Sequence, residues 1–284
     1  MPAEVRVWAH AKINLDLRVN GVRADGFHEL RTVFQSLALH DTLWLSSRPG
    51  PFRITCAAPG VPVDSSNLVW QAAEALWRAL GKGGRLRDVA VRLDKRVPAE
   101  AGLGGGSADA AATLKGLARL WAVRMSTVQL ANIAAGLGSD VPFFLTGGAA
   151  LGVGRGDEIT PLPDRARESA VLVIPAFGVS SLDAYAWYDA APPPASSRGN
   201  NDLEPVVTAR HPEIGLIRRA LEDAGARSAA MTGSGSTVYG LFEAHEEAAR
   251  AATLLESRRW RVVLTETLDR PIYARRARPV LVRT

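Results

Sequence analysis

The sequence predicts an α+β protein of two domains, and three observations support this prediction. Apolar and polar residues alternate near the start of the chain, for example over residues 13–19, as in strands with one buried face. Between residues 212 and 265 a helix, two strands, a helix and a strand follow one another, which is typical of an antiparallel sheet backed by helices. The composition changes near residues 161–163. We therefore expect an N-terminal domain over residues 1–163 and a C-terminal domain over residues 164–284.

The first predicted elements are strands, and they cover residues 5–9, 13–19, 30–39, 42–45 and 52–56. A turn-rich loop over residues 20–29 ends in Phe27 and His28, and His40-Asp41 is expected to form the turn of a hairpin. Lys12 and Asn14 stand one step apart on the same face of a strand. Such a pair fits either a solvated strand face or a functional site.

Residues 67–121 are predicted to form a helix, a strand, a glycine-rich loop and a second helix. A helix is predicted over residues 67–80 with Ser65 or Ser66 as its N-cap, and a strand over residues 89–93. The loop leads into a second helix, which we expect to begin at Ala108 and to end at Trp121.

A third helix is predicted to start in a capping box formed by Ser126 and Gln129, and glycines end it after residue 135. Asp140 follows, directly before the apolar run of residues 141–144. Its position fits a turn or cap residue, and equally a carboxylate held at a functional site.

The second half is predicted to begin with a buried strand over residues 170–174 and an aromatic-rich helix over residues 183–188. Residues 190–201, with three prolines, have the composition of a mobile loop. The later elements are a helix at 212–224, strands at 229–231 and 238–242, a helix at 245–258 and a strand at 262–265. Between the paired strands, residues 232–237 offer many small donors, so they suit an anion as well as a plain hairpin turn.

Composition and charge narrow the class of protein. The chain has 284 residues, a net charge of +5 and 47% hydrophobic residues, as in a globular protein that favours anionic partners. Cys56 is the single cysteine, so neither an intramolecular disulfide nor a cysteine metal cluster is expected. The start of the chain has no apolar signal core, and the apolar stretch over residues 141–153 is too short to span a bilayer. We expect a cytoplasmic protein without a membrane partner.

A nucleic-acid partner is not expected either. Basic residues are spread over the chain, and no cluster with interleaved aromatic residues stands out apart from Arg275, Arg276 and Arg278 near the end. Nucleotides and phosphorylated metabolites would satisfy the positive charge equally well.

The glycine-rich loop is the strongest functional signal in the chain. Gly102, Gly104, Gly105 and Gly106 let the backbone approach a ligand closely, and the following helix start directs free N–H groups at an anion. Ser107 adds a hydroxyl, as an N-cap or as a ligand of phosphate or metal. A flexible loop is the simpler interpretation, but the glycine density favours a phosphate site.

Three common nucleotide motifs do not fit this loop. A Walker loop requires Gly-Lys-Ser/Thr, and no such triplet occurs in the chain. The dinucleotide motif requires Gly or Ala where Ser107 stands, and the His-Arg-Asp and Asp-Phe-Gly motifs of protein kinases are absent.

A fourth pattern fits. The loop from Pro98 to Ala108 resembles the Pro-x3-Gly-Leu-Gly-Ser-Ser-Ala signature of the GHMP small-molecule kinases, and the stretches at residues 11–14 and 231–235 resemble the other two motifs of that family. The resemblance implies an N-terminal domain like ribosomal protein S5 domain 2, a ferredoxin-like C-terminal domain and a cleft between them. It also implies ATP as phosphate donor, with Mg²⁺. The implied ATP-binding residues are Pro98, Ala99, Glu100, Ala101, Gly102, Leu103, Gly104, Gly105, Gly106, Ser107 and Ala108.

Further stretches resemble the branch of the family that phosphorylates the 2-hydroxyl of a cytidine diphosphate-linked methylerythritol. They lie at residues 11–15, 23–28, 102–107, 138–142 and 201–204. Two residues depart from that branch: Ala108 stands where a second serine is common, and Phe27 where tyrosine is frequent. Phe27 can still stack on a base, but it cannot donate a phenol hydrogen bond.

The resemblance also implies roles for single residues. Asp140 would accept the proton of the acceptor hydroxyl, with Lys12 beside it, and Ser107 is the candidate metal ligand. Tyr185 and Tyr188 are alternatives to Trp187 as the ring that faces Phe27 across the base. The implied substrate-binding residues are Asn14, Phe27, His28, Trp187, Gly233 and Ser234.

Three other functions remain open from the sequence. A sibling kinase would phosphorylate mevalonate, homoserine or a sugar. A nucleotide-sensing regulator would keep the fold and the loop without turnover. A basic RNA-binding module of α+β build is the third.

Overall fold

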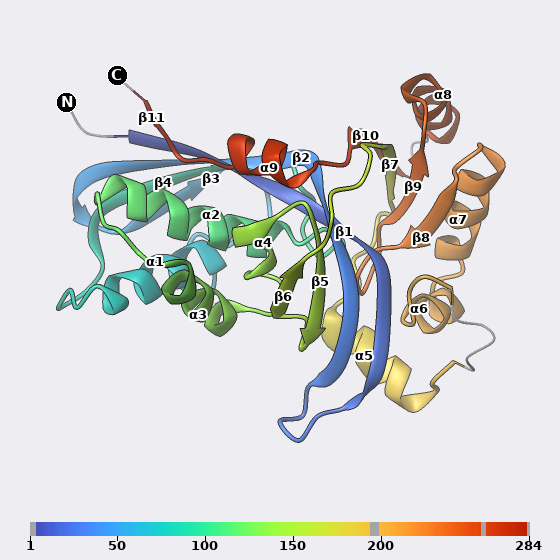
Figure 1. Ribbon diagram of the computed structural model, residues 1–284, viewed down its shortest axis with the longest axis horizontal. Coiled ribbons are helices and arrows are strands. Elements are labelled where there is room, and N and C mark those ends of the chain that lie inside the picture. Colours follow the sequence, from blue (N-terminus) through green and yellow to red (C-terminus); the bar gives the residue numbers. More distant parts are fainter. Residues whose placement is uncertain (1–3, 194–198, 257–259, 283–284) are drawn as a thin grey trace.

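The computed structural model describes residues 4–193, 199–256 and 260–282, which form two sheets side by side (Figure 1). Within these residues the first sheet has seven strands: β1 (Glu4–Val22), β2 (His28–Pro51), β3 (Arg53–Cys56), β4 (Arg87–Asp94), β5 (Ala149–Gly154), β6 (Glu158–Pro161) and β11 (Val280–Val282). The second has four: β7 (Ser169–Ile174), β8 (Ser228–Met231), β9 (Val238–Phe242) and β10 (Arg261–Glu266). The predicted two-domain α+β fold is confirmed.

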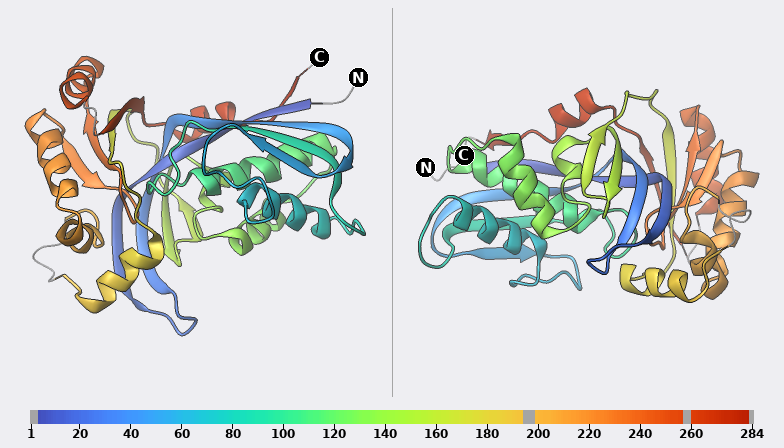
Figure 2. Two further views of the ribbon diagram at one scale, coloured as in Figure 1. Left: turned by 180° about the vertical axis from the view of Figure 1, so that it is seen from behind. Right: turned by 60° about the horizontal axis from the view of Figure 1, so that its bottom comes forward.

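A long antiparallel ribbon of β1 and β2 belongs to the first sheet, runs through the molecule and passes beside the second sheet (Figures 1 and 2). The predicted hairpin at His40-Asp41 is wrong, because β2 continues through both residues and His40 pairs with His10. The buried Asp41 carboxylate accepts hydrogen bonds from the backbone N–H groups of Arg96 and Val97. A polar residue that interrupts an apolar strand therefore marks a buried contact here and not a turn.

Four helices cover one face of the first sheet: α1 (Leu68–Ala79), α2 (Gly105–Leu120), α3 (Thr127–Leu137) and α4 (Phe143–Thr146). The inward-facing positions of β1, which include Val5 and Val7, are buried in one core with Leu114 and Leu117 of α2. The capping box of α3 is confirmed.

The starts of two helices differ from the prediction. Asn67 is the N-cap of α1, because the Asn67 side chain accepts the N–H of Val69 at 2.9 Å. Neither of the two predicted serines has this position. The second helix begins at Gly105, three positions earlier than expected, and the residue before it, Gly104, takes a left-handed conformation (φ 68°) that glycine adopts without strain.

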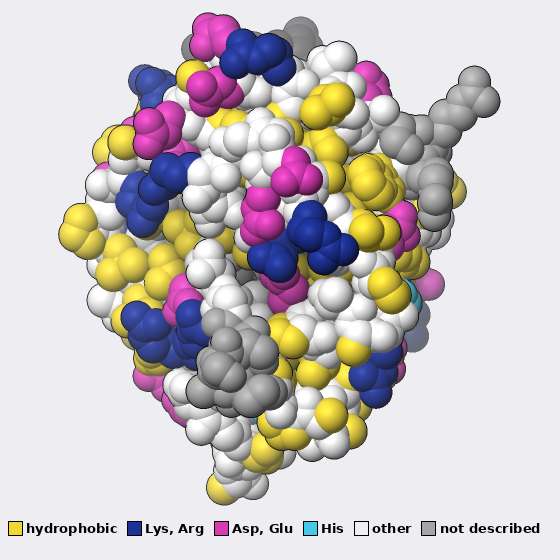
Figure 3. All heavy atoms as spheres, turned by 90° about the vertical axis from the view of Figure 1, so that its right-hand side faces the viewer, with side chains coloured by type: hydrophobic (Ala, Val, Ile, Leu, Met, Phe, Trp, Pro, Cys, Tyr) yellow, Lys and Arg dark blue, Asp and Glu magenta, His cyan; other side chains and the backbone are white. Residues whose placement is uncertain are grey.

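The second sheet is antiparallel in the order β10-β7-β9-β8, which matches the expected helix-backed arrangement. Its helices are α5 (Ser181–Ala190), α6 (Glu204–Arg210), α7 (Glu213–Asp223) and α8 (His245–Leu255). On the outer face of this domain, acidic and basic side chains lie beside one another, as in the pair of Arg218 with Glu222 (Figure 3). The predicted end of the helix at 245–258 and part of the proline-rich loop, residues 194–198, lie outside the described residues.

The end of the described chain returns to the first sheet. After β10, α9 (Arg270–Arg276) lies along the first domain and β11 pairs with β1, so both ends of the chain lie at the same side (Figure 1). Neither α9 nor β11 was expected from the sequence. The division into domains at residue 163 stays a prediction. None of the described helices has the length and apolar character needed to cross a bilayer.

Candidate active site

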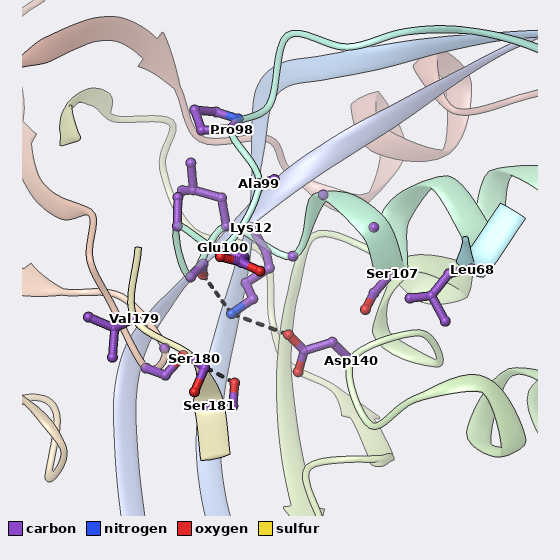
Figure 4. Close-up of a pocket in the computed structure, with 18 of the residues that line it drawn as sticks. Lys12, Leu68, Pro98, Ala99, Glu100, Ser107, Asp140, Val179, Ser180 and Ser181 are labelled. Carbon is purple, nitrogen blue, oxygen red and sulfur yellow. Dashed lines mark hydrogen bonds and ion pairs between the residues drawn. The ribbon is translucent and has the colours of Figure 1, made fainter. Parts of the chain in front are cut away.

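A cavity of about 680 Å³ lies where the two domains and the β1–β2 ribbon meet (Figure 4). One wall is the glycine loop with the start of α2, and the opposite wall carries Asp140 and the start of α5. Lys12 lies at the bottom between them. The predicted site residues that line this cavity are Lys12, Asn14, Pro98, Ala99, Glu100, Ala101, Gly102, Leu103, Gly104, Gly105, Gly106, Ser107, Asp140, Gly233 and Ser234.

The glycine loop is held in shape by close backbone contacts. Gly102 has a φ of 72°, and a Cβ atom there would lie 2.1 Å from the carbonyl oxygen of Thr232. A Cβ atom on Gly104 would lie 2.8 Å from Cζ of Phe144 and 3.1 Å from Cε of Lys12. Both glycines are therefore required by sterics, and the loop packs directly against the catalytic candidates.

The start of α2 supplies hydrogen-bond donors to the cavity. Helix geometry leaves the N–H groups of Gly105, Gly106 and Ser107 without a carbonyl partner inside the helix, and its dipole places partial positive charge there. Ser107 is not the N-cap, because Gly104 takes that position, but its side chain lines the cavity from the first turn of the helix. This end of α2 suits an anion.

Lys12 is the buried cation of the site. Its side chain is 4% exposed, and its Nζ donates to Oδ1 of Asn14 at 2.7 Å and to the carbonyl of Gly102 at 2.9 Å. The same Nζ lies 3.3 Å from Oδ2 of Asp140, and Figure 4 shows the two side chains pointing toward one another. The solvated-face interpretation of Lys12 is therefore wrong.

Asn14 acts mainly as a support for Lys12. Its Nδ2 donates to Oγ1 of Thr32 at 2.7 Å, and its backbone N–H donates to Oγ1 of Thr232 at 3.0 Å. The side chain is 3% exposed, so its polar atoms are already engaged. Asn14 fixes the position of Lys12 by linking the ribbon to the second domain.

Asp140 sits in the turn between α3 and α4, with a side chain that is 33% exposed. The following residues, Phe143 and Phe144, are buried in the core and anchor this turn. The carboxylate thus faces the open cavity on a rigid support, which is what a group that handles a proton of a bound molecule requires.

The second donor-rich segment docks onto the glycine loop. The N–H of Thr237 donates to the carbonyl of Ala101 at 3.3 Å, and Asn201 donates from its amide to the carbonyls of Met231 and Gly233 at 2.8 Å each. Gly233 and Ser234 reach the cavity, and the Ser234 hydroxyl lies 3.1 Å from that of Ser181. The segment is more than a plain hairpin turn, because it shapes one side of the cavity.

The two aromatic candidates on the ribbon, His28 and Phe27, make different contacts. His28 stacks on Tyr185 with ring centroids 4.5 Å apart, and its Nε2 lies 2.8 Å from Oδ1 of Asp189. Phe27 is 50% exposed at the tip of the ribbon, with the guanidinium of Arg155 4.9 Å from its ring. Tyr185 and Arg155 line the cavity, whereas the two predicted ribbon residues do not line it but contact these two side chains.

Trp187, one of the three candidates for the opposing ring, does not line the cavity, whereas Tyr185 does. Trp187 lies against Arg210, with 4.7 Å from the guanidinium to the ring centre, and against His211. Two positions along a helix correspond to a rotation of about 200°, so Tyr185 and Trp187 point to opposite sides of α5. Burial of the Tyr185 side chain, with a smaller contribution from Asp140, raises the pKa of its hydroxyl.

One part of the cavity was missed by sequence reasoning. It lies beyond the start of α2 and is lined by Gly60, Val61, Pro62, Ser66, Asn67 and Leu68. They belong to the loop before α1 and to the start of that helix, and their only sequence signal was this position at a helix start. The apolar members give this end of the cavity the character of a site for a flat ring.

A buried charge cluster at the same end was missed too. Nζ of Lys95 lies 2.5 Å from Oδ2 of Asp41 and 2.8 Å from Oδ2 of Asp109. Burial raises the pKa of Asp109 to about 8, against the opposing attraction of Lys95. Burial would lower the pKa of Lys95, but its two carboxylate neighbours outweigh that effect and raise it. Lys95 and Asp109 both line the cavity, so the cluster fixes a cation beside the helix start.

A metal site made by the protein alone is not found among the described residues, because no three acidic, histidine or cysteine side chains converge there. Ser107 and Asp140 are the oxygen donors that a cation accompanying a bound anion could meet in the cavity. Mg²⁺ often binds in this way, through one or two protein oxygens and substrate phosphates.

Comparison with protein families gives two matches. Residues 67–148 match the model of the GHMP kinases N terminal domain, and residues 193–259 match that of the GHMP kinases C terminal domain. The glycine loop and Asp140 fall inside the first match.

Curated relatives cover most of the chain. A 4-diphosphocytidyl-2-C-methyl-D-erythritol kinase from Solibacter usitatus is 43% identical over 273 residues, which cover 87% of this chain and 84% of the relative. A kinase of the same name from Moorella thermoacetica is 40% identical over 282 residues, which cover 92% of this chain and 98% of the relative.

Solved structures agree with these relatives. The crystal structure of a 4-(cytidine 5'-diphospho)-2C-methyl-D-erythritol kinase superposes with a TM-score of 0.76 and 32% identity, covering 92% of this chain and 98% of that one. A homoserine kinase from Cytophaga hutchinsonii superposes with a TM-score of 0.72 at 18% identity, covering 98% of this chain and 97% of that one, and it shows the shared fold alone.

Proposed function

The chain belongs to the GHMP kinase family, and on that premise we propose that it transfers the γ-phosphoryl group of ATP to the 2-hydroxyl of 4-diphosphocytidyl-2-C-methyl-D-erythritol. The products are the 2-phosphate and ADP, and the reaction serves the non-mevalonate route to isoprenoid precursors. The observation that carries the proposal is the ion pair of Lys12 and Asp140 beside the glycine loop, in a chain about 40% identical to kinases of that name.

The donor side of the cavity suits the triphosphate of ATP. The first-turn N–H groups of α2 and the alternating left-handed residues of the loop, Glu100, Gly102 and Gly104, form a concave row of backbone donors. The apolar segment around Val61 and Leu68 is the proposed place for the adenine ring, with Lys95 near the sugar and phosphates.

Transfer requires a base and a cation at one point, and Asp140 and Lys12 meet there. The acceptor oxygen attacks the γ-phosphorus, the bond from that phosphorus to the bridging oxygen breaks, and ADP leaves with the electron pair. Asp140 accepts the proton of the acceptor hydroxyl, an effect worth roughly 10²–10⁴-fold in rate. Lys12 faces this carboxylate and stabilises the charge on the phosphoryl group during its transfer.

Positioning contributes more than base strength in this chemistry, because the transition state of phosphoryl transfer is largely dissociative. The supports of Lys12 are therefore part of the proposed mechanism. Asn14 and the carbonyl of Gly102 hold Nζ from two sides, and the buried phenylalanines after Asp140 hold the carboxylate.

The acceptor side lies between the tip of the ribbon and α5. Phe27 and Tyr185 are the proposed rings on either side of the cytosine, and His28 is the proposed hydrogen-bond partner of the base edge. His28 already stacks on Tyr185 and contacts Asp189. The rings of His28 and Tyr185 therefore have to move apart before a base can enter between Phe27 and Tyr185.

Mg²⁺ is the proposed companion of ATP. Ser107, at the start of α2, is the residue that would contact it in the cavity. Bound there, the ion would neutralise phosphate charge during transfer. We further propose that the protein works in the cytoplasm on soluble substrates.

A sibling GHMP kinase activity is the second candidate function, because a homoserine kinase shares the whole fold. The residues that would separate the two are those at the acceptor side, Phe27, His28 and Tyr185.

The deciding experiment measures ATP turnover by the purified protein against four acceptors: 4-diphosphocytidyl-2-C-methyl-D-erythritol, mevalonate, homoserine and galactose. Turnover with the cytidyl substrate alone is the expected result, and the Asp140→Asn protein serves as the matched inactive control. Preferred turnover of another acceptor would favour the sibling activity. ATP binding without turnover of any acceptor would favour a regulator, and salt-sensitive binding of RNA would favour the nucleic-acid alternative.

A further inference from the structure

A second cavity, distant in sequence from the glycine loop, collects basic side chains. It has a volume of about 210 Å³, and it lies between β1, the end of α9 and β11. Its lining residues are Arg6, Trp8, Arg275, Arg276, Arg278 and Val280. None of them lines the central cavity.

The positive charge of this cavity is largely unbalanced. Within the described residues, Arg276 is paired with Glu266 at 3.2 Å, whereas Arg6, Arg275 and Arg278 have no carboxylate within ion-pair distance. Elsewhere on the molecule arginines are commonly paired with carboxylates. Arginines on the second domain lie beside acidic partners, as Arg218 does with Glu204 and Glu222.

The aromatic wall gives the cavity a fixed shape. The ring of Trp8 stacks on His40 at 4.6 Å, and the guanidinium of Arg6 lies 5.5 Å from the Trp8 ring and 5.7 Å from the Trp44 ring. Arg6 is also paired with Val280 across β1 and β11. Arg6 is therefore held in place by stacking, while its charge remains available to a ligand.

Charge and size together select the class of ligand. Guanidinium groups keep their charge at all physiological pH values and bind phosphate oxygens in pairs of hydrogen bonds. The cavity is smaller than the roughly 300 Å³ at the lower end of pockets for drug-sized ligands, so it does not admit a whole nucleotide. We propose that the cavity formed by Arg6, Arg275, Arg276 and Arg278 binds a compact multivalent phosphate, such as a free diphosphate or the diphosphate end of a small metabolite.

The position of this cavity connects it to the central site through α9. From the middle of this short helix Tyr273 donates a hydrogen bond of 2.6 Å to the carbonyl of Phe144, and from its first residue Arg270 donates to the carbonyl of Ala149. These contacts hold the segment that follows Asp140. An anion at the arginines would relieve the repulsion among them and strengthen the docking of α9.

The test is a calorimetric titration of the whole protein with inorganic pyrophosphate. The central cavity is first saturated with a non-hydrolysable ATP analogue, so that the glycine loop does not contribute. We expect binding at one further site, and we expect the double variant Arg275→Gln/Arg278→Gln to weaken it by about tenfold or more, because two charge-assisted contacts are lost. The matched control, Arg219→Gln/Arg250→Gln, removes two exposed arginines from α7 and α8 and should bind as the unaltered protein does.

A second double variant separates the loss of paired hydrogen bonds from the loss of charge. Arg275→Lys/Arg278→Lys keeps the charge but loses the paired hydrogen bonds, so its affinity should lie between those of the unaltered protein and the Gln variant. Absence of binding to the unaltered protein would overturn the proposal, and so would equal affinity in the Gln variant. Neither outcome depends on the kinase reaction, because the ATP analogue holds the donor side of the central cavity throughout and no acceptor is present.

Discussion

Lys12 Nζ lies 3.3 Å from the Asp140 carboxylate at the bottom of the central cavity, although one residue comes from the first strand and the other from a turn after α3. The buried cation is surrounded by oxygen atoms of Asn14 and Gly102, and the carboxylate is open to the cavity. The pair therefore combines a fixed charge with a group that can reach a bound hydroxyl.

Removing the charge of Asp140 should stop transfer without affecting ATP binding. Asp140→Asn keeps the size of the side chain but not its ability to accept a proton, so kcat should fall by roughly 10²–10⁴-fold. ATP affinity, measured by calorimetry, should stay nearly the same. Asp223→Asn, at an exposed position of α7, is the matched control. Unchanged turnover in the Asp140 variant would remove this residue from the mechanism.

Lys12→Ala should reduce kcat by at least as much as Asp140→Asn, because it removes the cation that faces both the carboxylate and the phosphoryl group. The two residues act as one unit, so the double variant should be no slower than the slower single variant. Lys82→Ala, which removes an exposed lysine beside Trp77, is the control and should keep full turnover. Additive losses in the double variant would argue that the two side chains act separately.

The close packing around the glycine loop predicts that a single added methyl group lowers stability and ATP binding. Gly104→Ala places a Cβ atom 2.8 Å from Phe144 and 3.1 Å from Lys12 at a φ of 68°. We expect a loss of about 1–3 kcal/mol in the free energy of unfolding and a higher KM for ATP. Gly83→Ala is the control, because nothing lies within 4 Å of the added atom. Urea unfolding and ATP kinetics of the two variants would separate steric crowding from a general effect of alanine.

Asp109 should make the stability depend on pH. Its pKa is raised by burial from 3.8 to about 8 in the folded protein. Between these two pH values the folded state therefore holds a proton that the unfolded state has lost. The contribution of Asp109 to stability is therefore full below pH 3.8 and falls as the pH rises toward 8. The slope is at most about 1.4 kcal/mol per pH unit.

Asp109→Asn removes this titration, so its stability relative to the unaltered protein should rise steadily between about pH 4 and pH 8. Urea unfolding at several pH values measures the difference, and titratable groups that do not contact Asp109 cancel because both proteins carry them. A difference that does not change with pH would contradict the burial of a titrating carboxyl at this position.

Tyr273→Phe tests whether α9 positions the segment after Asp140. The change removes a hydrogen bond of 2.6 Å to the carbonyl of Phe144, which should cost about 1 kcal/mol of stability and lower kcat more than it raises the KM for ATP. Tyr239→Phe is the matched control, because the buried hydroxyl of Tyr239 has no partner among the described residues and its loss should cost little. A fall in stability with unchanged kcat would assign Tyr273 a purely structural part.

Local patterns in the sequence were sufficient for most strands and helices. Strand β9 and the capping box of α3 agree with the prediction because their signals, a run of β-branched and aromatic residues and a side-chain cap, act within a few residues. The false hairpin at His40-Asp41 and the missed helix α9 have a different origin. Both are determined by partners far along the chain, Arg96 and Val97 for Asp41 and Phe144 for Tyr273.

The sequence by itself determined the family, the glycine loop and the identity of Lys12 and Asp140 as candidates, because motif residues are defined by type and spacing. The tertiary structure decided which side chains meet. It placed Tyr185 and not Trp187 at the cavity, it buried Lys95 between two aspartates, and it gathered four arginines around Trp8. Such contacts depend on which face of a helix or strand is turned inward, and that is fixed by the packing of distant segments against one another.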